Sequence, residues 1–205
     1  MAGTLGVVVA GGHGRRLGSA LPKAQVSLAG LTLLERAIRT LEPCCDELIV
    51  ATSPAVTLRA GPHRVVVDDG GPPGPLAGIV TGLKAAPFAR ALVLAVDLPL
   101  VGGALFEALL ARLGGHAAVI PEDEERWQPL AAIYAPPAAE ALARARAGGA
   151  TSLIQAVRDL DPRVLPAAEL AALGIAPGTF LNVNTAEDLA RAGRRLAARP
   201  AAAGA

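Results

Sequence analysis

Residues suited to binding phosphate are gathered in a glycine-rich segment near the start of the chain. An apolar run that ends at Ala10 leads into Gly11-Gly12-His13-Gly14-Arg15-Arg16-Leu17-Gly18, and Lys23 follows shortly after. Glycine has no Cβ, so backbone N–H groups in such a turn can approach a phosphate closely. Arginine can hold two phosphate oxygens at once, and lysine adds a compact positive charge. The segment indicates a phosphate-binding turn, with a solvated surface loop as the alternative.

The spacing of the glycines excludes two well-known motifs of this kind. The dinucleotide fingerprint, counted from Gly12 and Gly14, needs a third glycine where Leu17 stands. The Walker A motif needs Lys and then Ser or Thr after its last glycine, whereas Ser19 follows Gly18. The phosphate ligand is therefore expected to belong to another class of nucleotide-binding protein.

A carboxylate follows the most hydrophobic run of the chain. Residues 91–96 lead directly into Asp97, and Pro99 helps to fix the turn that presents it. Desolvating a carboxylate is costly unless it is paired, hydrogen-bonded or bound to a metal ion. Because Mg²⁺ takes one or two carboxylates and completes its shell with waters and phosphate oxygens, Asp97 is the candidate Mg²⁺ ligand. The alternatives are an N-cap for a helix near Gly102 and a salt-bridge partner.

Four further polar residues follow or precede expected elements at positions suited to ligand binding. Asp68 precedes the glycine- and proline-rich residues 70–79, and an acid there can accept hydrogen bonds from a purine base or a ribose. Asn182 and Asn184 stand just before the last expected helix, and Gln128 precedes an expected strand. The alternatives are an ordinary turn at Asp68, a local cap at the asparagines and a plain strand entry at Gln128.

The spacing of apolar residues predicts alternating strands and helices that would position these side chains. Continuous apolar runs predict strands at residues 6–10, 47–52, 64–67, 91–96 and 117–120, and a run opened by Pro129 predicts an edge strand at 129–135. Helical patterns cover residues 32–41, 75–86, 102–113, 137–147, 151–160 and 185–198, with capping-box spacing at Thr32/Glu35 and Thr185/Asp188. Strands joined by helices imply right-handed crossovers and a mostly parallel sheet.

These elements predict a single three-layer α/β/α domain over residues 1–198. Its sheet should be mostly parallel and Rossmann-like, with an antiparallel edge element. Residues 199–205 are rich in Ala, Gly and Pro, have little to bury, and are expected to form a disordered tail. Open α/β sheets bind ligands beyond the carboxyl ends of their strands, where the glycine turn, Asp68 and Asp97 stand.

The composition excludes several other classes of protein. The chain has 205 residues, 52% of them hydrophobic and 2% aromatic, with a formal net charge of +1. That charge balance argues against a nucleic-acid-binding or membrane-surface protein, and no apolar run is long enough to span a bilayer. Cys44 and Cys45 are adjacent, so they provide no disulfide framework, and a cytoplasmic protein is expected.

Taken together, these segments resemble the molybdenum cofactor guanylyltransferase (MobA-type) family of nucleotidyltransferases. The matching motifs, in family order, are Val9-Ala10-Gly11-Gly12 with Arg15-Arg16-Leu17-Gly18 and Lys23, then Gly74-Pro75-Leu76-Ala77-Gly78-Ile79, Asp97-Leu98-Pro99, Gln128-Pro129-Leu130 and Asn182-Val183-Asn184-Thr185. The resemblance implies a sheet of the nucleotide-diphospho-sugar transferase type.

The same resemblance implies an activity and a set of site residues. The activity is Mg²⁺-dependent transfer of GMP from GTP to the terminal phosphate of molybdopterin, with release of pyrophosphate. The implied nucleotide-binding residues are Ala10, Gly11, Gly12, Lys23, Asp68 and Asp97. The implied catalytic residues are Arg15, Lys23 and Asp97, and Asp97 is also the implied Mg²⁺ ligand. The implied acceptor-binding residues are Gly78, Gln128, Asn182 and Asn184. Lys23 and Asp97 must then share one cleft. GTP and molybdopterin are the expected partners, with transient contact to cofactor-delivery proteins or molybdoenzymes.

Two positions depart from the family pattern. Pro22 stands before the signature lysine where the family has Asp, and Ala51-Thr52-Ser53 stands where the family has Asn. A Pro-Lys pair is frequent in sugar-phosphate and methylerythritol nucleotidyltransferases. Two alternatives therefore stay open: a nucleotidyltransferase that transfers CMP or a sugar-linked nucleotide, and a GTP-binding regulator without turnover.

Overall fold

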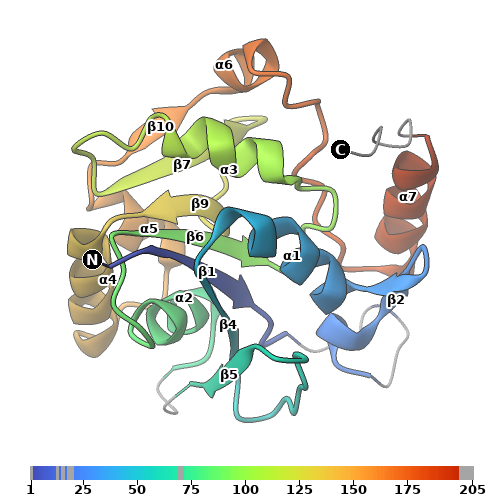
Figure 1. The fold of residues 1–205 in the computed structure, drawn as a ribbon, viewed down its shortest axis with the longest axis horizontal. Helices are drawn as coiled ribbons and strands as arrows, with labels where there is room; N and C mark the ends of the chain where they lie inside the picture. Colours follow the sequence, from blue (N-terminus) through green and yellow to red (C-terminus); the bar gives the residue numbers. More distant parts are fainter. Residues whose placement is uncertain (1, 13, 15–16, 18–20, 69–71, 199–205) are drawn as a thin grey trace.

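A central sheet between two layers of helices forms the protein in the computed structural model, which describes residues 2–12, 14, 17, 21–68 and 72–198 (Figure 1). The strands are β1 (Thr4–Val9), β2 (Ser27–Leu28), β3 (Leu31–Thr32), β4 (Glu47–Thr52), β5 (Arg64–Val67), β6 (Arg90–Ala95), β7 (Ala118–Asp123), β8 (Arg126–Trp127), β9 (Ala131–Tyr134) and β10 (Arg163–Leu165). The helices are α1 (Leu33–Leu41), α2 (Pro75–Leu83), α3 (Gly103–Leu110), α4 (Pro136–Ala147), α5 (Leu153–Arg158), α6 (Ala167–Ala172) and α7 (Ala186–Ala197), with single 3₁₀ turns η2 (Lys23–Gln25) and η3 (Glu42–Cys44).

The main sheet is mostly parallel. Its strand order is β10-β7-β9-β6-β1-β4-β5, and β8 pairs with β7. β1 pairs in parallel with β4 and β6, β4 with β5, and β7 with β10, whereas β9 is antiparallel to both of its neighbours. β2 and β3 form a separate two-stranded antiparallel sheet. The predicted fold class, a three-layer domain with a mostly parallel sheet, is confirmed.

The predicted edge position of the strand at residues 129–135 is wrong. β9 lies between β6 and β7, and all four of its residues are buried. Proline disfavours a central strand because it has no N–H for the ladder, but Pro129 precedes the first residue of β9 and removes no ladder bond. The Tyr134 hydroxyl donates to the Pro129 carbonyl over 2.7 Å and fixes this turn.

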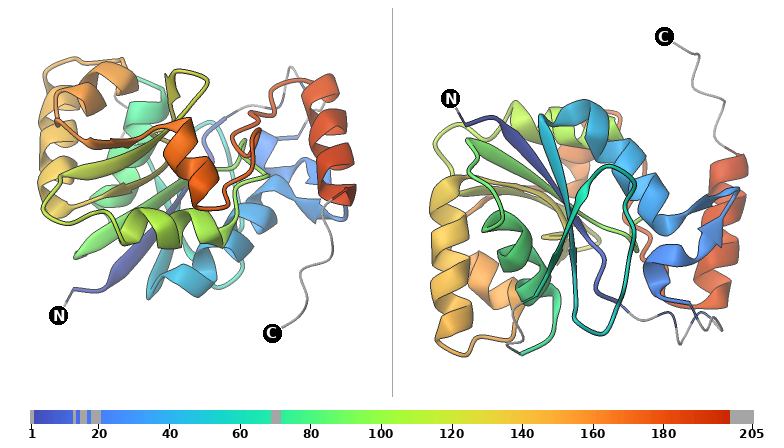
Figure 2. Two further views of the ribbon diagram at one scale, coloured as in Figure 1. Left: turned by 90° about the horizontal axis from the view of Figure 1, so that it is seen from above. Right: turned by 60° about the horizontal axis from the view of Figure 1, so that its bottom comes forward.

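Both faces of the sheet are covered, which explains the continuous apolar runs. Successive side chains of a strand point to opposite faces. In β6, Leu92 and Leu94 belong to the apolar cluster under α1 and α3, and Ala91 and Val93 to the cluster under α2, α4 and α5. Figure 2 shows these two helical layers on either side of the strands. A strand buried on both faces needs apolar residues at every position rather than at alternate ones.

The first and last long helices begin at the predicted caps. Thr32 caps α1 in a capping box with Glu35, and Thr185 caps α7 in a capping box with Asp188. α7 packs beside β2, at a distance from the main sheet (Figures 1 and 2). The C-terminal segment thereby returns to the part of the chain that holds Lys23.

Two further expectations concern the ends of the chain and its environment. The expected disordered tail, residues 199–205, lies outside the described residues, and the single domain over residues 1–198 stays a prediction. Within the described part of the chain, no helix combines the length and apolar character needed to cross a membrane.

Candidate active site

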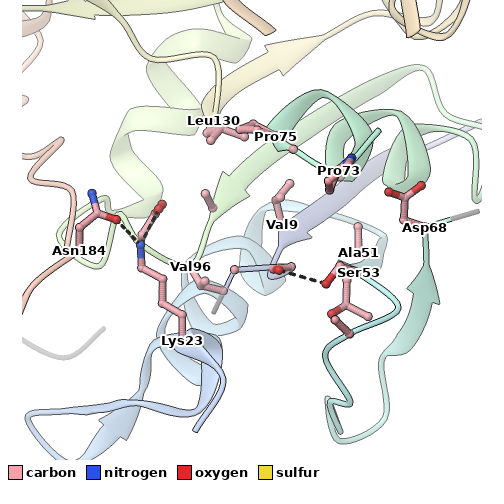
Figure 3. Close-up of a pocket in the computed structure, with 18 residues that line it drawn as sticks. Val9, Lys23, Ala51, Ser53, Asp68, Pro73, Pro75, Val96, Leu130 and Asn184 are labelled. Atoms are coloured by element: carbon pink, nitrogen blue, oxygen red, sulfur yellow. Dashed lines mark hydrogen bonds and ion pairs between the residues drawn. The ribbon is translucent and has the colours of Figure 1, made fainter. Parts of the chain in front are cut away.

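A cavity of about 700 Å³ opens at the edge of the sheet where the parallel strands β1, β4, β5 and β6 end (Figure 3). Its size suits a nucleotide-sized ligand. Among the predicted site residues, the cavity is lined by Gly11, Gly12, Lys23, Asp68, Gly78, Asp97 and Asn184. Lys23 and Asn184 lie at one end of the cavity and Asp68 at the other. The site thus stands at the position that open α/β sheets use for ligands.

Hydrogen bonds to its backbone fix the glycine turn and bring Lys23 to the cavity. The Ser53 hydroxyl, at the end of β4, donates to the Gly11 carbonyl over 3.1 Å. A Cβ at Gly14 would lie 2.5 Å from the Leu21 carbonyl oxygen, so no larger residue fits there. The Lys23 amide donates to the Gly12 carbonyl over 3.2 Å, and the lysine is therefore placed directly against the turn.

Lys23, Asp97 and Asn184 form a cluster of hydrogen bonds inside the cavity. The Lys23 ammonium donates to Asp97 Oδ2 over 2.9 Å and to Asn184 Oδ1 over 2.7 Å. The Lys23 side chain is 8% exposed and that of Asp97 20% exposed. A buried ammonium needs such partners, because desolvation of an isolated charge is expensive. Three segments far apart in the sequence thus place one positive charge at the end of β1 and β6.

Asp97 has one carboxylate oxygen left for a ligand. Oδ2 accepts from Lys23, whereas Oδ1 is buried and has no hydrogen-bond partner among the residues that the structure describes. A buried oxygen of this kind fits a Mg²⁺ ligand. No group of three or more His, Cys, Asp or Glu that could hold a metal ion occurs among the described residues. An ion here would therefore depend on phosphate oxygens and water for the rest of its shell, as Mg²⁺ commonly does.

The turn after β6 is arranged to present Asp97. The Asp97 carbonyl accepts a hydrogen bond from the Val183 amide over 2.8 Å, and the Leu98 amide donates to the Ala95 carbonyl over 3.2 Å. Of the two alternatives for Asp97, the N-cap is wrong, because Gly102 caps α3 without a side-chain bond. The salt bridge is present, and its partner is Lys23 inside the cavity.

Asp68, at the other end of the cavity, is paired with an arginine that the sequence did not indicate. Its amide donates to the Thr52 carbonyl over 2.9 Å, and its Oδ1 accepts from Nη2 of Arg146. Arg146 comes from the last turn of α4. An arginine at that point of a helix is usually solvated or interacts with the helix dipole, so nothing in the local sequence singles it out.

The N-terminus of α2 faces the cavity. Pro73, Gly74 and Pro75 line it, and the N-cap Gly74, with φ of 150°, provides no side-chain cap. The uncapped amides and the helix dipole favour an anion there. A Cβ at Gly78 would lie 2.7 Å from Val9 Cγ1, so glycine at this position lets α2 pack directly on β1.

Several predicted site residues lie elsewhere. Ala10 is fully buried, and its amide donates to the Ala51 carbonyl over 2.8 Å, so it stands behind the cavity. Gln128 and Asn182 do not line the cavity; the Gln128 amide group donates to the Arg126 carbonyl over 3.3 Å. Arg15 lies outside the described residues.

Comparison with known proteins relates the chain to a family. Residues 6–162 match the model of the MobA-like NTP transferase domain. A probable molybdenum cofactor guanylyltransferase of Natronomonas pharaonis is 35% identical over 198 residues, which is 93% of this chain and 97% of that protein.

Solved structures show the same fold. The crystal structure of molybdopterin-guanine dinucleotide biosynthesis protein A from Archaeoglobus fulgidus has a TM-score of 0.78 and 26% identity, covering 95% of this chain and all of that chain (100%). The 2-C-methyl-D-erythritol 4-phosphate cytidylyltransferase of Thermus thermophilus has a TM-score of 0.67 and 22% identity, covering 95% and 98%, respectively. The second likeness concerns the fold alone.

Proposed function

Because the chain belongs to the MobA-like NTP transferase family, we propose that it transfers GMP from GTP to the terminal phosphate of molybdopterin and releases pyrophosphate. The observation that carries this proposal is the contact between Lys23 and Asp97, 2.9 Å apart in a cavity of nucleotide size. The names of the relatives support the choice of GMP and of molybdopterin.

The proposed reaction is an in-line displacement at phosphorus. An oxygen of the terminal phosphate of molybdopterin forms a bond to the α-phosphorus of GTP, and the bond from that phosphorus to the bridging oxygen of pyrophosphate breaks. The attacking phosphate is already ionised, so no side chain has to remove a proton. The protein's contribution is to align the reactants and to neutralise charge.

The places of the cavity residues support the roles that we propose for them. The backbone at Gly11 and Gly12 approaches the triphosphate, and the Lys23 ammonium neutralises its oxygens. The uncapped N-terminus of α2 stabilises a further phosphate group. Asp68, at the opposite end, accepts hydrogen bonds from guanine or its ribose. Arg15 is expected to add a second positive charge at the glycine turn.

We assign the metal-binding role to Asp97. Its unpartnered Oδ1 would hold Mg²⁺, and Oδ2 is held by Lys23. When bound, the ion supplies positive charge to the phosphate oxygens and to the departing pyrophosphate. The hydrogen bond from Lys23 to Oδ2 and the bond from the Val183 amide to the Asp97 carbonyl keep the carboxylate in place.

The acceptor side is assigned to Gly78, Gln128, Asn182 and Asn184. Gly78 and Asn184 line the cavity and are therefore the better placed of the four. Asn184 is also a partner of Lys23, so it joins the acceptor side to the triphosphate side.

A pyrophosphate-release assay tests the proposal. Purified protein with Mg²⁺ and molybdopterin is offered GTP, CTP, ATP and UTP, and release with GTP is expected to exceed that with the other nucleotides. Preference for another nucleotide would replace the guanylyl assignment.

The second candidate function, transfer of CMP, is favoured by Pro22, which stands directly before Lys23. Tight GTP binding without pyrophosphate release would favour the regulator.

A further inference from the structure

The ion pair between Asp68 and Arg146 is buried at one end of the cavity. The Asp68 side chain is 7% exposed and that of Arg146 10% exposed. Asp68 lines the cavity and Arg146 does not, so the arginine stands behind the carboxylate as seen from the ligand. We propose that Arg146 is a positioning residue that holds Asp68 as an ionised, oriented acceptor for N–H or O–H donors of the bound guanosine nucleotide. This inference rests on the proposed function.

The burial of Asp68 requires a positive partner. A carboxylate removed from water is stable in its ionised form only when a charge or several hydrogen bonds compensate it. Arg146 provides a positive charge and one hydrogen bond, from Nη2 to Oδ1. Without the arginine, the buried carboxylate would lose its compensating charge and turn toward solvent. It would then no longer present the same acceptor to the cavity.

Among the residues that the structure describes, Arg146 is the one that holds the Asp68 side chain. The backbone of Asp68 is fixed by the bond of its amide to the Thr52 carbonyl, at the end of two paired strands. Arg146 is held in place by the helix layer to which α4 belongs. In that layer α4 packs against α2, and the buried Leu142 of α4 is part of the apolar cluster under α2, α4 and α5. A rigid guanidinium on a packed helix fixes the plane of a carboxylate better than a flexible ammonium does.

An ionised carboxylate selects ligands by their donors. It only accepts hydrogen bonds, so an acceptor atom of a ligand placed against it is repelled. Guanine carries two neighbouring donors, the ring N1–H and the 2-amino group, whereas on the corresponding edge adenine has one donor beside an acceptor and cytosine has one donor beside two acceptors. The ribose hydroxyls are the other donors of the nucleotide. Holding Asp68 ionised therefore contributes to nucleotide selectivity.

Two substitutions at Arg146 and one control test the role. Arg146→Met removes the charge and keeps the length, Arg146→Lys keeps the charge, and Arg144→Met alters the neighbouring, 73% exposed arginine. Calorimetric titration with GTP and Mg²⁺ is expected to show binding weakened by about tenfold or more for Arg146→Met, only partly restored by Arg146→Lys, which keeps the charge but not the rigid guanidinium, and unchanged by Arg144→Met. In steady-state assays KM for GTP should rise while kcat changes less than about threefold.

Analogues of GTP identify the donor that Asp68 accepts from. Inosine triphosphate lacks the 2-amino group, and 2′-deoxyGTP lacks a ribose hydroxyl. The analogue that lacks the relevant donor should bind wild-type protein more weakly than GTP does, and Arg146→Met should reduce that difference. If the variant loses affinity for GTP and both analogues equally, with the same discrimination as wild type, the arginine has no selective role.

A double substitution keeps the test valid if Arg146→Met does not fold. Asp68→Asn with Arg146→Met removes both charges of this pair, and it should bind GTP as Asp68→Asn alone does, because Arg146 acts through Asp68. A folded Arg146→Met with wild-type affinity overturns the inference, as does a double variant that is weaker than Asp68→Asn by tenfold. Binding is measured without molybdopterin, so failure of wild-type turnover would count against the proposed function alone.

Discussion

The two carboxylates of the cavity differ in where their positively charged partners lie. Asp97 and Asp68 each follow a parallel strand, and each is paired with a positive side chain. The partner of Asp97 is Lys23, which lines the cavity itself and also contacts Asn184. The partner of Asp68 is Arg146, which stands outside the cavity. A ligand that enters the cavity meets both charges of the first pair but only the negative charge of the second.

This difference separates charge neutralisation from recognition. The Lys23 ammonium is a compact charge on a flexible chain that can be shared among phosphate oxygens, and Asp97 Oδ1 has no hydrogen-bond partner within the described part of the chain. In the Asp68–Arg146 pair the positive charge lies outside the cavity, so the cavity is lined only by the carboxylate. A carboxylate accepts hydrogen bonds and donates none. We therefore expect changes at the Lys23 end to lower turnover and changes at the Asp68 end to weaken nucleotide binding.

The largest effect is expected at Asp97. Asp97→Ala should reduce Mg²⁺-dependent pyrophosphate release by on the order of 10³-fold or more, because it removes the candidate metal ligand. The fold should persist, since Lys23 keeps its bond to Asn184. Circular dichroism and thermal unfolding check the fold, and Asp159→Ala, at an exposed carboxylate, is the control. Undiminished turnover would remove Asp97 from the mechanism.

A somewhat smaller effect is expected at Lys23. Lys23→Ala should lower kcat on the order of 10²-fold, as does the loss of one preorganised electrostatic contact. The matched control is Lys84→Ala, which alters the only other lysine of the chain at an exposed position. A loss below about threefold in the initial rate would place Lys23 outside the reaction, and the contrast between the two ends of the cavity would disappear.

Asn184 should have an intermediate effect that tests how Lys23 is held. Asn184→Ala removes one hydrogen bond to the ammonium, and a bond to a charged group is worth about 1.5–3 kcal/mol, so kcat should fall by about tenfold. Initial rates at saturating GTP and molybdopterin measure this. A change confined to KM for molybdopterin would instead show that Asn184 binds the acceptor and does not orient Lys23.

The smallest effect concerns the cap of α7. Burial raises the pKa of Asp188, but hydrogen bonds from the Asn184 amide and from the hydroxyl and amide of Thr185 outweigh it, and the pKa lies below its usual value. A lowered pKa stabilises the folded state above about pH 4, and this contribution is lost as the pH falls through the folded-state pKa.

Thermal unfolding between pH 7 and pH 3 measures the contribution of Asp188. The melting temperature of Asp188→Asn should lie below that of wild type at neutral pH, and the two should converge under acid conditions. A constant difference over this range would contradict the role of the ionised carboxylate. The Asn184 amide is one of the donors, so this cap belongs to the Lys23 end of the cavity.

Much of the fold could be predicted because its apolar patterns are long. The strands at 47–52 and 64–67 have the predicted bounds, and both capping boxes are present. β2, β3 and β8 have two residues each, and β10 and α6 are also short, so they have too little periodicity to be found. The helix predicted to end at residue 86 ends at Leu83, because apolar residues beyond it pack without helical geometry.

The two ends of the site differ in how far the sequence could predict them. Lys23 and Asp97 stand in motifs whose residue types indicate their chemistry, and the expectation that they share one cleft agrees with the structure. Arg146 lies 78 residues from Asp68, in a helix with two arginines. Only the packing of α4 brings it to β5, and a single sequence has no local signal for such packing. Ser53, which holds the glycine turn, was missed for the same reason.

The contact between Lys23 and Asn184 has a consequence for how the protein is made. The two residues are 161 positions apart, and Asn184 lies beyond the region that the family model matches. During synthesis the sheet strands leave the ribosome well before the segment that carries Asn184. The ammonium therefore gains its second partner only after all of the described strands have been synthesised, and a chain that terminates between β10 and Asn184 would retain those strands while its lysine stays incompletely anchored.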